Sequence, residues 1–401
     1  MIRRLQYAVV ASSTALVVFL LFGAVHGRTS AADNNPYTQL GVYSEVLSRI
    51  KGDYVEEPDI KAVTIGAING MLEALDPFAS YLNADQYKQY QRAKQTSKPD
   101  VGLLLSRRLG YIGVMDAVPG SAAAKANLST GDVIESINNV ATRDMPLAFA
   151  EILLQGDAGT SVELSVLRLR QQEPQKVVLV RAATVHPPIG ARLVTEGAPD
   201  PVGLITSSTL EGARVREIAA KVGDLEKQGA KKIILDLRYC GVGTPDEGIA
   251  LANLFLDRGL ITYSQGQKIS RQDYSAAPGR SVTTLPLVVL ANRGTAGGAE
   301  IAAAALLDAK RAEVVGERTY GNAAIRKPVT LDDGSAVILS VAKYYTPAGK
   351  AIQDNGVTPS VPQAEVEAPA ADDDDPDAAD VPQAKPGEDP ILKRALGGRY
   401  K

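Results

Sequence analysis

The sequence predicts an α/β protein with a helical N-terminal region, a small middle domain and a larger core with a mostly parallel sheet. Three patterns support this mixed class. Residues 35–98 carry helical patterns, residues 99–183 carry short strands between glycine turns, and residues 184–362 alternate apolar strands with helices. Continuous apolar strands between helices are typical of a parallel sheet that is covered on both faces.

The composition is that of a globular chain and argues against several kinds of chemistry. Hydrophobic residues make up 45% of the 401 residues, and the net charge of -3 gives no indication of nucleic-acid binding. The single cysteine, Cys240, excludes an intrachain disulfide. The chain has two histidines, His26 and His186, and this small number argues against a histidine-based zinc site or a Ser-His-Asp triad. We therefore expect no metal and no cofactor.

Residues 1–27 read as a signal peptide or a membrane anchor. Arg3 and Arg4 precede an apolar run over residues 8–25, near the short end of the roughly 17–25 residues that span a bilayer. No clean cleavage site follows, which favours an uncleaved anchor over a cleaved signal peptide; a core helix is a third interpretation. Arginines stay on the inner side, so the rest of the chain is predicted to lie in the cell envelope, periplasmic or extracellular.

The region 35–98 is predicted to contain three helices. The first has an amphipathic apolar face. The second runs from about Ile60 to Leu75 and ends where Asp76-Pro77 breaks it within 75-LDPFASYL-82. A tyrosine-rich helix then continues to about Gln95.

The middle domain, residues 99–183, resembles a PDZ domain. The stretch 120-GSAAAKANLSTGDVIESINN-139 matches the family segment G-S-P-A-x-x-A-G-L-x-x-G-D-x-I, with Ala122 and Asn127 in place of its Pro and Gly. The resemblance implies that backbone N–H groups of a loop capture a terminal carboxylate while the peptide adds as an extra strand. On the residues alone, the segment 101-VGLLL-105, which the resemblance makes the binding loop and its strand, could equally be a buried strand. The peptide-binding residues implied are Val101, Gly102, Leu103, Leu104 and Leu105.

The core, residues 184–362, is expected to alternate strand and helix. After it, residues 363–387 are rich in Pro, Ala and Asp, with four aspartates at 372–375, and are predicted to form a disordered linker. Residues 388–401 form either a short helix or a frayed tail. The expected strands lie in 202–208, 231–238, 285–292 and 334–347, and the expected helices in 211–229, 245–259 and 299–310.

The order of these regions resembles that of the C-terminal processing, or tail-specific, serine peptidases. Four matches are specific as a set: 75-LDPFASYL-82, 233-IILDLR-238, 316-GERTYG-321 and 344-YYTPAGKAI-352. In that family a serine attacks the peptide carbonyl, a buried neutral lysine takes the proton, and a glutamine orients the lysine. The resemblance also implies an oxyanion loop of backbone N–H groups.

The three catalytic positions that the resemblance implies are occupied here by Gly297, Asn322 and Arg326. The stretch 291-ANRGTAGGAEI-301 follows the family pattern N-x-x-[ST]-A-S-A-x-E-[IVL], but glycine stands where the serine is expected. In the second pattern, T-x-G-K-G-x-V-Q, asparagine replaces lysine and arginine replaces glutamine. Glycine offers no nucleophile, asparagine cannot act as a general base, and arginine is a permanent cation without an acceptor.

Neighbouring residues offer no clear substitutes. Thr295 fits the family pattern and is expected to cap the following helix. Lys327 adjoins Arg326, but one step along a strand turns a side chain to the opposite face. Cys240 is expected to be a small buried hydrophobe. The segment 236-DLRYCGVG-243 departs from the family's D-L-R-x-N-P-G-G, which leaves Gly243 and Gly298 as the oxyanion-loop candidates.

The resulting hypothesis is a pseudopeptidase with no intact catalytic residue. It would bind the C-termini or unfolded segments of envelope proteins as a scaffold or regulator, with an active paralogue or further copies of itself as partners. The alternatives are an active endopeptidase that uses a displaced nucleophile, and a structural envelope protein whose PDZ domain binds nothing.

Overall fold

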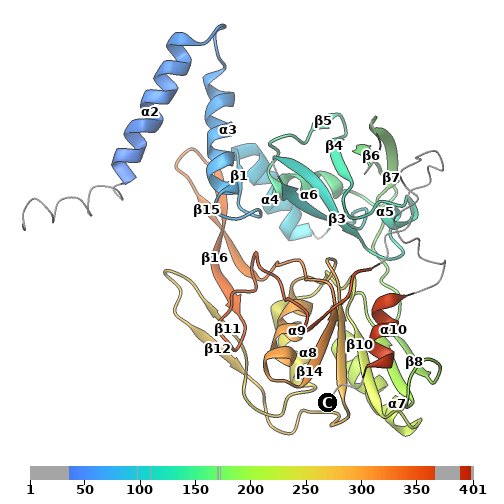
Figure 1. Cartoon of the computed structure of the whole chain (residues 1–401). Coiled ribbons are helices and arrows are strands. Elements are labelled where there is room, and N and C mark those ends of the chain that lie inside the picture. Colours follow the sequence, from blue (N-terminus) through green and yellow to red (C-terminus); the bar gives the residue numbers. More distant parts are fainter. Residues whose placement is uncertain are drawn as a thin grey trace, which may run out of the picture. The chain divides into compact units, whose positions relative to one another are not determined.

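The computed structural model describes residues 36–96, 98–108, 110–168, 171, 173–365 and 389–398 (Figure 1). The chain divides into two compact units, one up to Ala67 and one from Ile68 onward. The predicted signal peptide or anchor at 1–27 and nearly all of the predicted acidic linker lie outside the described residues. None of the helices described is both long and apolar enough to cross a membrane.

The first unit contains helix α2 (Pro36–Asp53) and the first half of helix α3 (Ile60–Glu73). Both helices were predicted from the sequence. Apolar side chains on α2 remain in contact with solvent, since Leu40 is 59% and Val46 is 51% exposed. The apolar face of α2 is therefore largely exposed among the described residues, with Leu47 and Ile50 only partly covered.

The second unit opens with the rest of α3, strand β1 (Ser80–Leu82) and helix α4 (Ala84–Thr96). Asp76 ends the helical stretch, and its carboxylate accepts a hydrogen bond from the Phe78 backbone N–H at 2.7 Å. Strand β1 was not predicted. It forms because it pairs antiparallel with strand β16 (Ala336–Tyr345), more than 250 residues further along the chain.

The PDZ domain is a sheet in the order β2-β3-β4-β6-β7, with β5 paired to β4. Strand β2 is an edge strand, which is where an added peptide strand would have to pair. Apolar side chains from these strands and both helices form one cluster around Ile112 and Ile134. The elements are β2 (Leu103–Arg108), β3 (Tyr111–Ala117), α5 (Ala122–Lys125), β4 (Val133–Ile137), β5 (Val140–Ala141), α6 (Leu147–Leu154), β6 (Ser161–Leu167) and β7 (Gln175–Val180).

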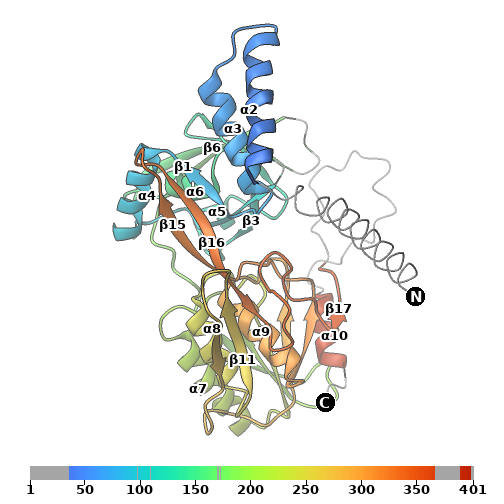
Figure 2. The ribbon, with the colours of Figure 1, turned by 90° about the vertical axis from the view of Figure 1, so that its left-hand side faces the viewer.

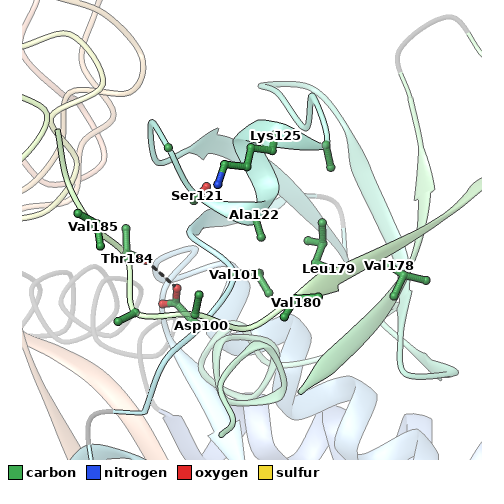
Figure 3. Close-up of a pocket in the computed structure, with 14 residues that line it drawn as sticks. Asp100, Val101, Ser121, Ala122, Lys125, Val178, Leu179, Val180, Thr184 and Val185 are labelled. Carbon is green, nitrogen blue, oxygen red and sulfur yellow. Dashed lines mark hydrogen bonds between the residues drawn. The ribbon is translucent and has the colours of Figure 1, made fainter. Parts of the chain in front are cut away.

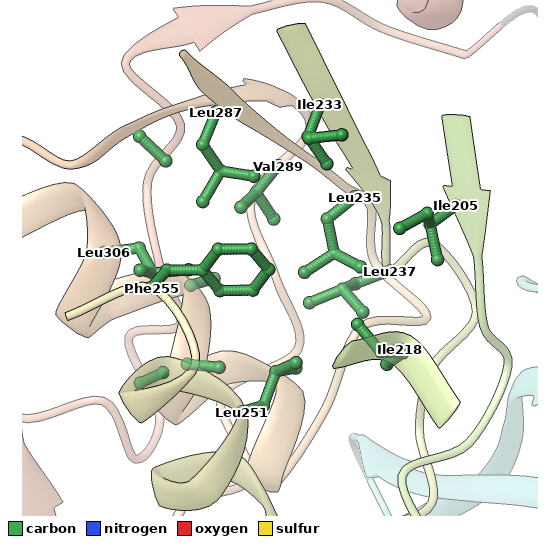
Figure 4. Packing of buried hydrophobic residues seen from close by; sticks show 14 of the residues in the cluster. Ile205, Ile218, Ile233, Leu235, Leu237, Leu251, Phe255, Leu287, Val289 and Leu306 are labelled. Atoms are coloured by element: carbon green, nitrogen blue, oxygen red, sulfur yellow. The ribbon is translucent and has the colours of Figure 1, made fainter. Parts of the chain in front are cut away.

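The α/β core contains a six-stranded sheet in the order β17-β14-β13-β10-β9-β8, parallel except for the antiparallel pair β8–β9. Side chains alternate between its two faces: Ile233 and Leu235 face the helices α7, α8 and α9, and Ile234 faces helix α10 (Figures 1 and 4). The strands are β8 (Gly190–Val194), β9 (Val202–Thr206), β10 (Lys232–Asp236), β13 (Leu287–Ala291), β14 (Ala312–Gly316) and β17 (Val361–Pro362). The helices are α7 (Arg214–Lys227), α8 (Pro245–Asn253), α9 (Gly298–Asp308) and α10 (Pro390–Gly397).

A second sheet of the core runs in the order β1-β16-β11-β12, with β15 also paired to β16 (Figure 2). Its long strand β16 was expected, but the other members were not. They are short and pair over long sequence distances, which leaves little local signal. They are β11 (Leu260–Gln265), β12 (Gln272–Ser275) and β15 (Ala324–Thr330).

Helix α10 covers the second face of the parallel sheet with Ile391, Ala395 and Leu396. Its C-terminal carbonyl groups, of residues 395, 396 and 398, accept hydrogen bonds from the Lys232 ammonium group at 2.8–3.3 Å. The last segment is therefore a packed helix rather than a frayed tail.

Candidate functional site

The candidate site lies at the turn between strand β13 and helix α9. The turn is fixed by side chains that bond to backbone groups: the Asn292 carboxamide oxygen accepts from the N–H groups of Tyr239 and Gly294, both at 3.0 Å. The Thr295 hydroxyl donates to the Leu237 carbonyl at 2.9 Å and accepts from the Asn292 N–H at 3.1 Å. Thr295 thus braces the turn and does not cap α9, contrary to the prediction; the N-cap residue is Gly297.

Gly297 stands at the tip of this turn with φ 62° and ψ -123°. This is a conformation that residues with a side chain adopt only under strain. A β-carbon at this position would meet the Gly243 carbonyl oxygen at 3.3 Å and the Asn322 carbonyl oxygen at 3.9 Å. Position 297 therefore faces the two segments that the sequence assigned to the oxyanion loop and to the base.

The buried carboxylate of Glu300 joins the turn to the segment that carries Asn322. It accepts backbone N–H bonds from Gly321 at 2.6 Å, Asn322 at 2.8 Å and Gly297 at 3.1 Å, and a hydroxyl bond from Thr319. Burial raises the pKa of Glu300 to about 7, although the four hydrogen bonds act in the opposite direction. This residue therefore organises the site through backbone groups.

Asn322 and Arg326 form a direct pair. One terminal nitrogen of the Arg326 guanidinium donates to the Asn322 side-chain oxygen at 2.6 Å. The guanidinium carbon lies 4.0 Å from the centroid of the Phe78 ring, and that ring makes an edge contact with Tyr320. The two positions that the resemblance assigned to a base and its orienting partner are thus adjacent in space, but they hold a cation and an amide.

The two oxyanion-loop candidates, Gly243 and Gly298, lie against each other. The Gly298 N–H donates to the Gly243 carbonyl at 3.4 Å. Both positions require glycine, because a β-carbon would approach Leu210 to 2.8 Å at one and the Thr244 carbonyl oxygen to 2.3 Å at the other. Their role in stabilising an oxyanion stays a prediction.

No alternative nucleophile or base stands beside Gly297 among the residues considered from the sequence. Cys240 is fully buried in the core, and burial raises the pKa of its thiol, so it carries no thiolate at neutral pH. Lys327 is exposed on strand β15. His186 lies 3.9 Å from Glu211, in the segment between the PDZ domain and the core.

Asp116 brings a buried carboxyl group from strand β3 of the PDZ domain to the same turn. One oxygen accepts from the Ala117 N–H at 2.8 Å, and the other is buried and has no hydrogen-bond partner among the described residues. A β-carbon on Gly294 would lie 2.7 Å from that second oxygen. Burial raises the pKa of Asp116 to about 7. No sequence motif indicated a role for this residue.

The peptide-binding stretch predicted at Val101–Leu105 begins as a tight loop and continues into β2. The Gly102 N–H donates to the Asp100 carboxylate at 2.7 Å, and φ is 74° at Gly102. Val101 is almost completely buried, whereas Leu103 is partly exposed. The Leu105 carbonyl accepts from the Tyr320 hydroxyl at 3.3 Å, so β2 touches the segment next to Asn322.

A pocket of about 570 Å³ adjoins this loop (Figure 3). Helix α5, strand β7 and residues 182–185 line it, with Lys125 and the exposed Val178 on its walls. Asp100 accepts a hydrogen bond from Thr184 at 3.4 Å within it. Of the predicted peptide-binding residues, only Val101 lines this pocket.

Comparison with known proteins decides the family. The carboxy-terminal processing protease CtpA of Bacillus subtilis is 30% identical over 355 residues, which cover 88% of this chain and 74% of that protein. The chain belongs to the carboxy-terminal processing protease family, peptidase family S41. The sequence pattern of peptidase family S41 matches residues 201–363, and that of the PDZ domain matches residues 113–168.

Other members of the family show the same relationship. The carboxyl-terminal-processing protease of Synechocystis is 34% identical over 314 residues, covering 77% of this chain and 73% of its own. A solved structure of the photosystem II D1 C-terminal processing protease shares 30% identity and a TM-score of 0.65, covering 80% of this chain and 92% of its own. The resemblance and the fold class inferred from the sequence are confirmed.

The sequence did not indicate how Arg326 is held. Phe78 lies within the matched 75-LDPFASYL-82 motif, and Tyr320 lies within 316-GERTYG-321, so both were part of recognised segments. Their aromatic character was the available signal, because guanidinium groups often stack on aromatic rings. The register that brings them to Arg326 depends on long-range strand pairing.

Proposed function

We propose that this family member is a pseudopeptidase that binds C-terminal or extended polypeptide segments without cleaving them. One observation carries the proposal. Positions 297, 322 and 326 lie together at the turn. Position 297 has no side chain, position 322 carries an amide and position 326 carries a guanidinium.

The chemistry of these groups supports binding more than catalysis. Acyl transfer by this family needs an oxygen nucleophile and a neutral amine to take its proton. Gly297 has no side chain, and the Asn322 amide oxygen already accepts from Arg326. Loss of one catalytic member costs serine peptidases several orders of magnitude in rate, and members that act as a unit do not compensate for one another. Background rates are therefore expected.

Polypeptide binding is supported by the free edge of β2 in the PDZ sheet. A peptide that pairs with this edge would run beside Tyr320, because the Tyr320 hydroxyl reaches the Leu105 carbonyl. The ligands proposed are C-termini or unfolded segments of envelope proteins, and the protein would serve as a scaffold or regulator. An active paralogue or further copies of the same chain are the proposed assembly partners.

Export to the cell envelope is part of the proposal. It rests on residues 1–27, where two arginines precede an apolar run. Membrane anchoring is favoured over cleavage of this segment. Fractionation of cells that carry a C-terminally tagged chain tests it: the tag should be in the membrane fraction and accessible to protease from outside the inner membrane.

The test of the central claim is a cleavage assay on the full chain with an unfolded protein, β-casein, and with a fluorophosphonate probe. The Bacillus subtilis relative CtpA serves as the positive control. We expect no peptide products by mass spectrometry and no labelled band. Labelling of this chain, or cleavage that persists after further purification, would show a displaced nucleophile and reject the proposal. Peptide display against residues 99–183 separates binding from a purely structural role, which predicts no C-terminal preference.

A further inference from the structure

We propose that Arg326 and Asn322 form a receptor for the terminal carboxylate of a polypeptide, built where the family's base and orienting group are expected. This inference rests on the proposed function, because it requires a site that does not hydrolyse its ligand. It differs from the PDZ loop in place and in chemistry: side-chain groups of strand β15 and the segment before it would bind the carboxylate.

The carrying observation is the way in which Arg326 is held. Its guanidinium bonds to the neutral Asn322 amide and lies over the Phe78 ring, and among the described residues it forms no ion pair. Its Nε atom is buried without a hydrogen-bond partner. Buried cations are normally paired, so a partly buried guanidinium without a carboxylate partner indicates a place for an anionic ligand.

Nearby carboxylates do not satisfy this cation. Asp76, Glu151 and Asp354 lie near enough to attract it electrostatically, yet none reaches ion-pair distance. Asp76 instead accepts a hydrogen bond from the Ser340 hydroxyl. These negative charges reduce the electrostatic attraction between Arg326 and an anion at a distance. They therefore favour a ligand whose oxygens contact the guanidinium directly.

Asn322 supplies a second donor group. Its oxygen must face Arg326, because a guanidinium offers only donors, and this orientation leaves the amide nitrogen to donate elsewhere. Asn322 and Arg326 both retain partial exposure, so a ligand can reach them.

The space at Gly297 favours a polypeptide terminus over other anions. The atoms around a β-carbon placed there are the carbonyl oxygens of Gly243 and Asn322, which suit the N–H groups of a ligand. Arg326, bonded to the side chain of the same Asn322, suits a carboxylate. A C-terminal residue carries both an amide N–H and a carboxylate, whereas inorganic phosphate or a lipid headgroup lacks the amide.

The test uses the full ¹⁵N-labelled chain and N-acetyl-trialanine as the probe, as free acid and as C-terminal amide at matched ionic strength. Nuclear magnetic resonance follows the Arg326 Nε–H signal, which is assigned by its loss in Arg326→Gln. We expect the free acid to shift this signal in a saturable way and to bind at least about tenfold more tightly there than the amide, as one charge-assisted hydrogen bond provides. Lys327→Gln removes the same charge from the exposed neighbouring residue and should leave the preference unchanged.

Three outcomes would overturn the inference: no saturable shift, equal shifts from acid and amide, or loss of the preference for the acid in Lys327→Gln. Binding that moves only backbone signals of Val101–Leu105 would place carboxylate recognition in the PDZ loop alone. A far-ultraviolet circular dichroism spectrum equal to that of the wild type is required of each variant, and Arg326→Lys, which keeps the charge, replaces any variant that fails. β-Casein added to the same samples reports cleavage by mass spectrometry, so failure of the proposed function is seen separately.

Discussion

Replacement of Glu300 by alanine should strongly destabilise the core, because this carboxylate is the shared acceptor of one buried network. It accepts from the N–H groups of Gly297, Gly321 and Asn322 and from the hydroxyl of Thr319. A buried donor left without an acceptor costs about 1–3 kcal/mol. Four such donors set a large upper bound on the loss of stability. Water that enters the cavity, and the removal of a buried charge, make the actual loss smaller. We expect a loss of about 3–5 kcal/mol, at the high end for single substitutions.

Glu300→Gln refines the same reasoning. Its amide keeps one acceptor oxygen, which can serve Gly297 and Asn322, but its nitrogen then faces the Gly321 N–H that lies 2.6 Å from the present carboxylate. Two donors in contact are repulsive, so we expect a smaller but clear loss, about 2 kcal/mol. Urea unfolding followed by circular dichroism measures both variants. Hydrogen exchange of residues 316–326 locates the effect.

The control is Glu217→Ala, which removes an exposed glutamate from the first turn of helix α7. Among the described residues, it forms an ion pair only with Arg214, at 3.2 Å. Exposed pairs contribute about 0–1 kcal/mol, so this variant should stay close to the wild type. If Glu300→Ala lost less than about 1 kcal/mol, or no more than the control, the carboxylate would not be the centre of the network and the reasoning would be refuted.

Three further predictions follow from buried groups. Burial raises the pKa values of Asp116 and Glu300 to about 7 in the folded chain. The protonated forms therefore favour the fold: their contribution is complete below about pH 4 and is lost as pH rises through 7. Urea unfolding should give a lower free energy of unfolding at pH 8 than at pH 5, and Asp116→Asn should reduce this difference. Lys232→Met leaves three carbonyls of helix α10 without their donor. In this variant the hydrogen-exchange rates of the α10 amides should rise by about tenfold or more. The same rates should stay unchanged in Lys231→Met, which replaces an exposed lysine. Gly102→Ala should unfold the PDZ loop, since φ is 74° and a β-carbon would lie 2.2 Å from the nearest side-chain atom; undiminished peptide binding would contradict this.

The sequence predicted the parts of the fold that carry long local patterns. The strands around Ile233 and Val288 are continuously apolar, and the helices beside them have regular spacing, so both could be placed without tertiary information. Strand β1 could not, because three residues carry no periodic signal and their pairing with β16 is a long-range choice. Strand β15 was also missed, since none of its side chains is fully buried and Arg326, Lys327 and Pro328 interrupt any apolar alternation.

At the site, the resemblance predicted which positions meet but not how their side chains interact. The turn at Gly297 and the segment of Asn322 do lie together. The pair between Asn322 and Arg326 depends on side-chain conformations that no pattern specifies. Thr295 shows the limit most clearly. Its type and position predicted a helix cap, but its hydroxyl bonds to the Asn292 N–H and the Leu237 carbonyl instead.

These contacts explain how the framework of the site is held without the catalytic side chains that the resemblance implies. Glu300 bonds to the backbone N–H groups of Gly297 and Asn322, which every residue except proline provides. Asn292 and Thr295 likewise brace the turn through backbone groups. These bonds are therefore independent of the side chains at positions 297 and 322. Membership of the family says nothing by itself about cleavage, and the predicted catalytic positions 297, 322 and 326 are where activity has to be tested.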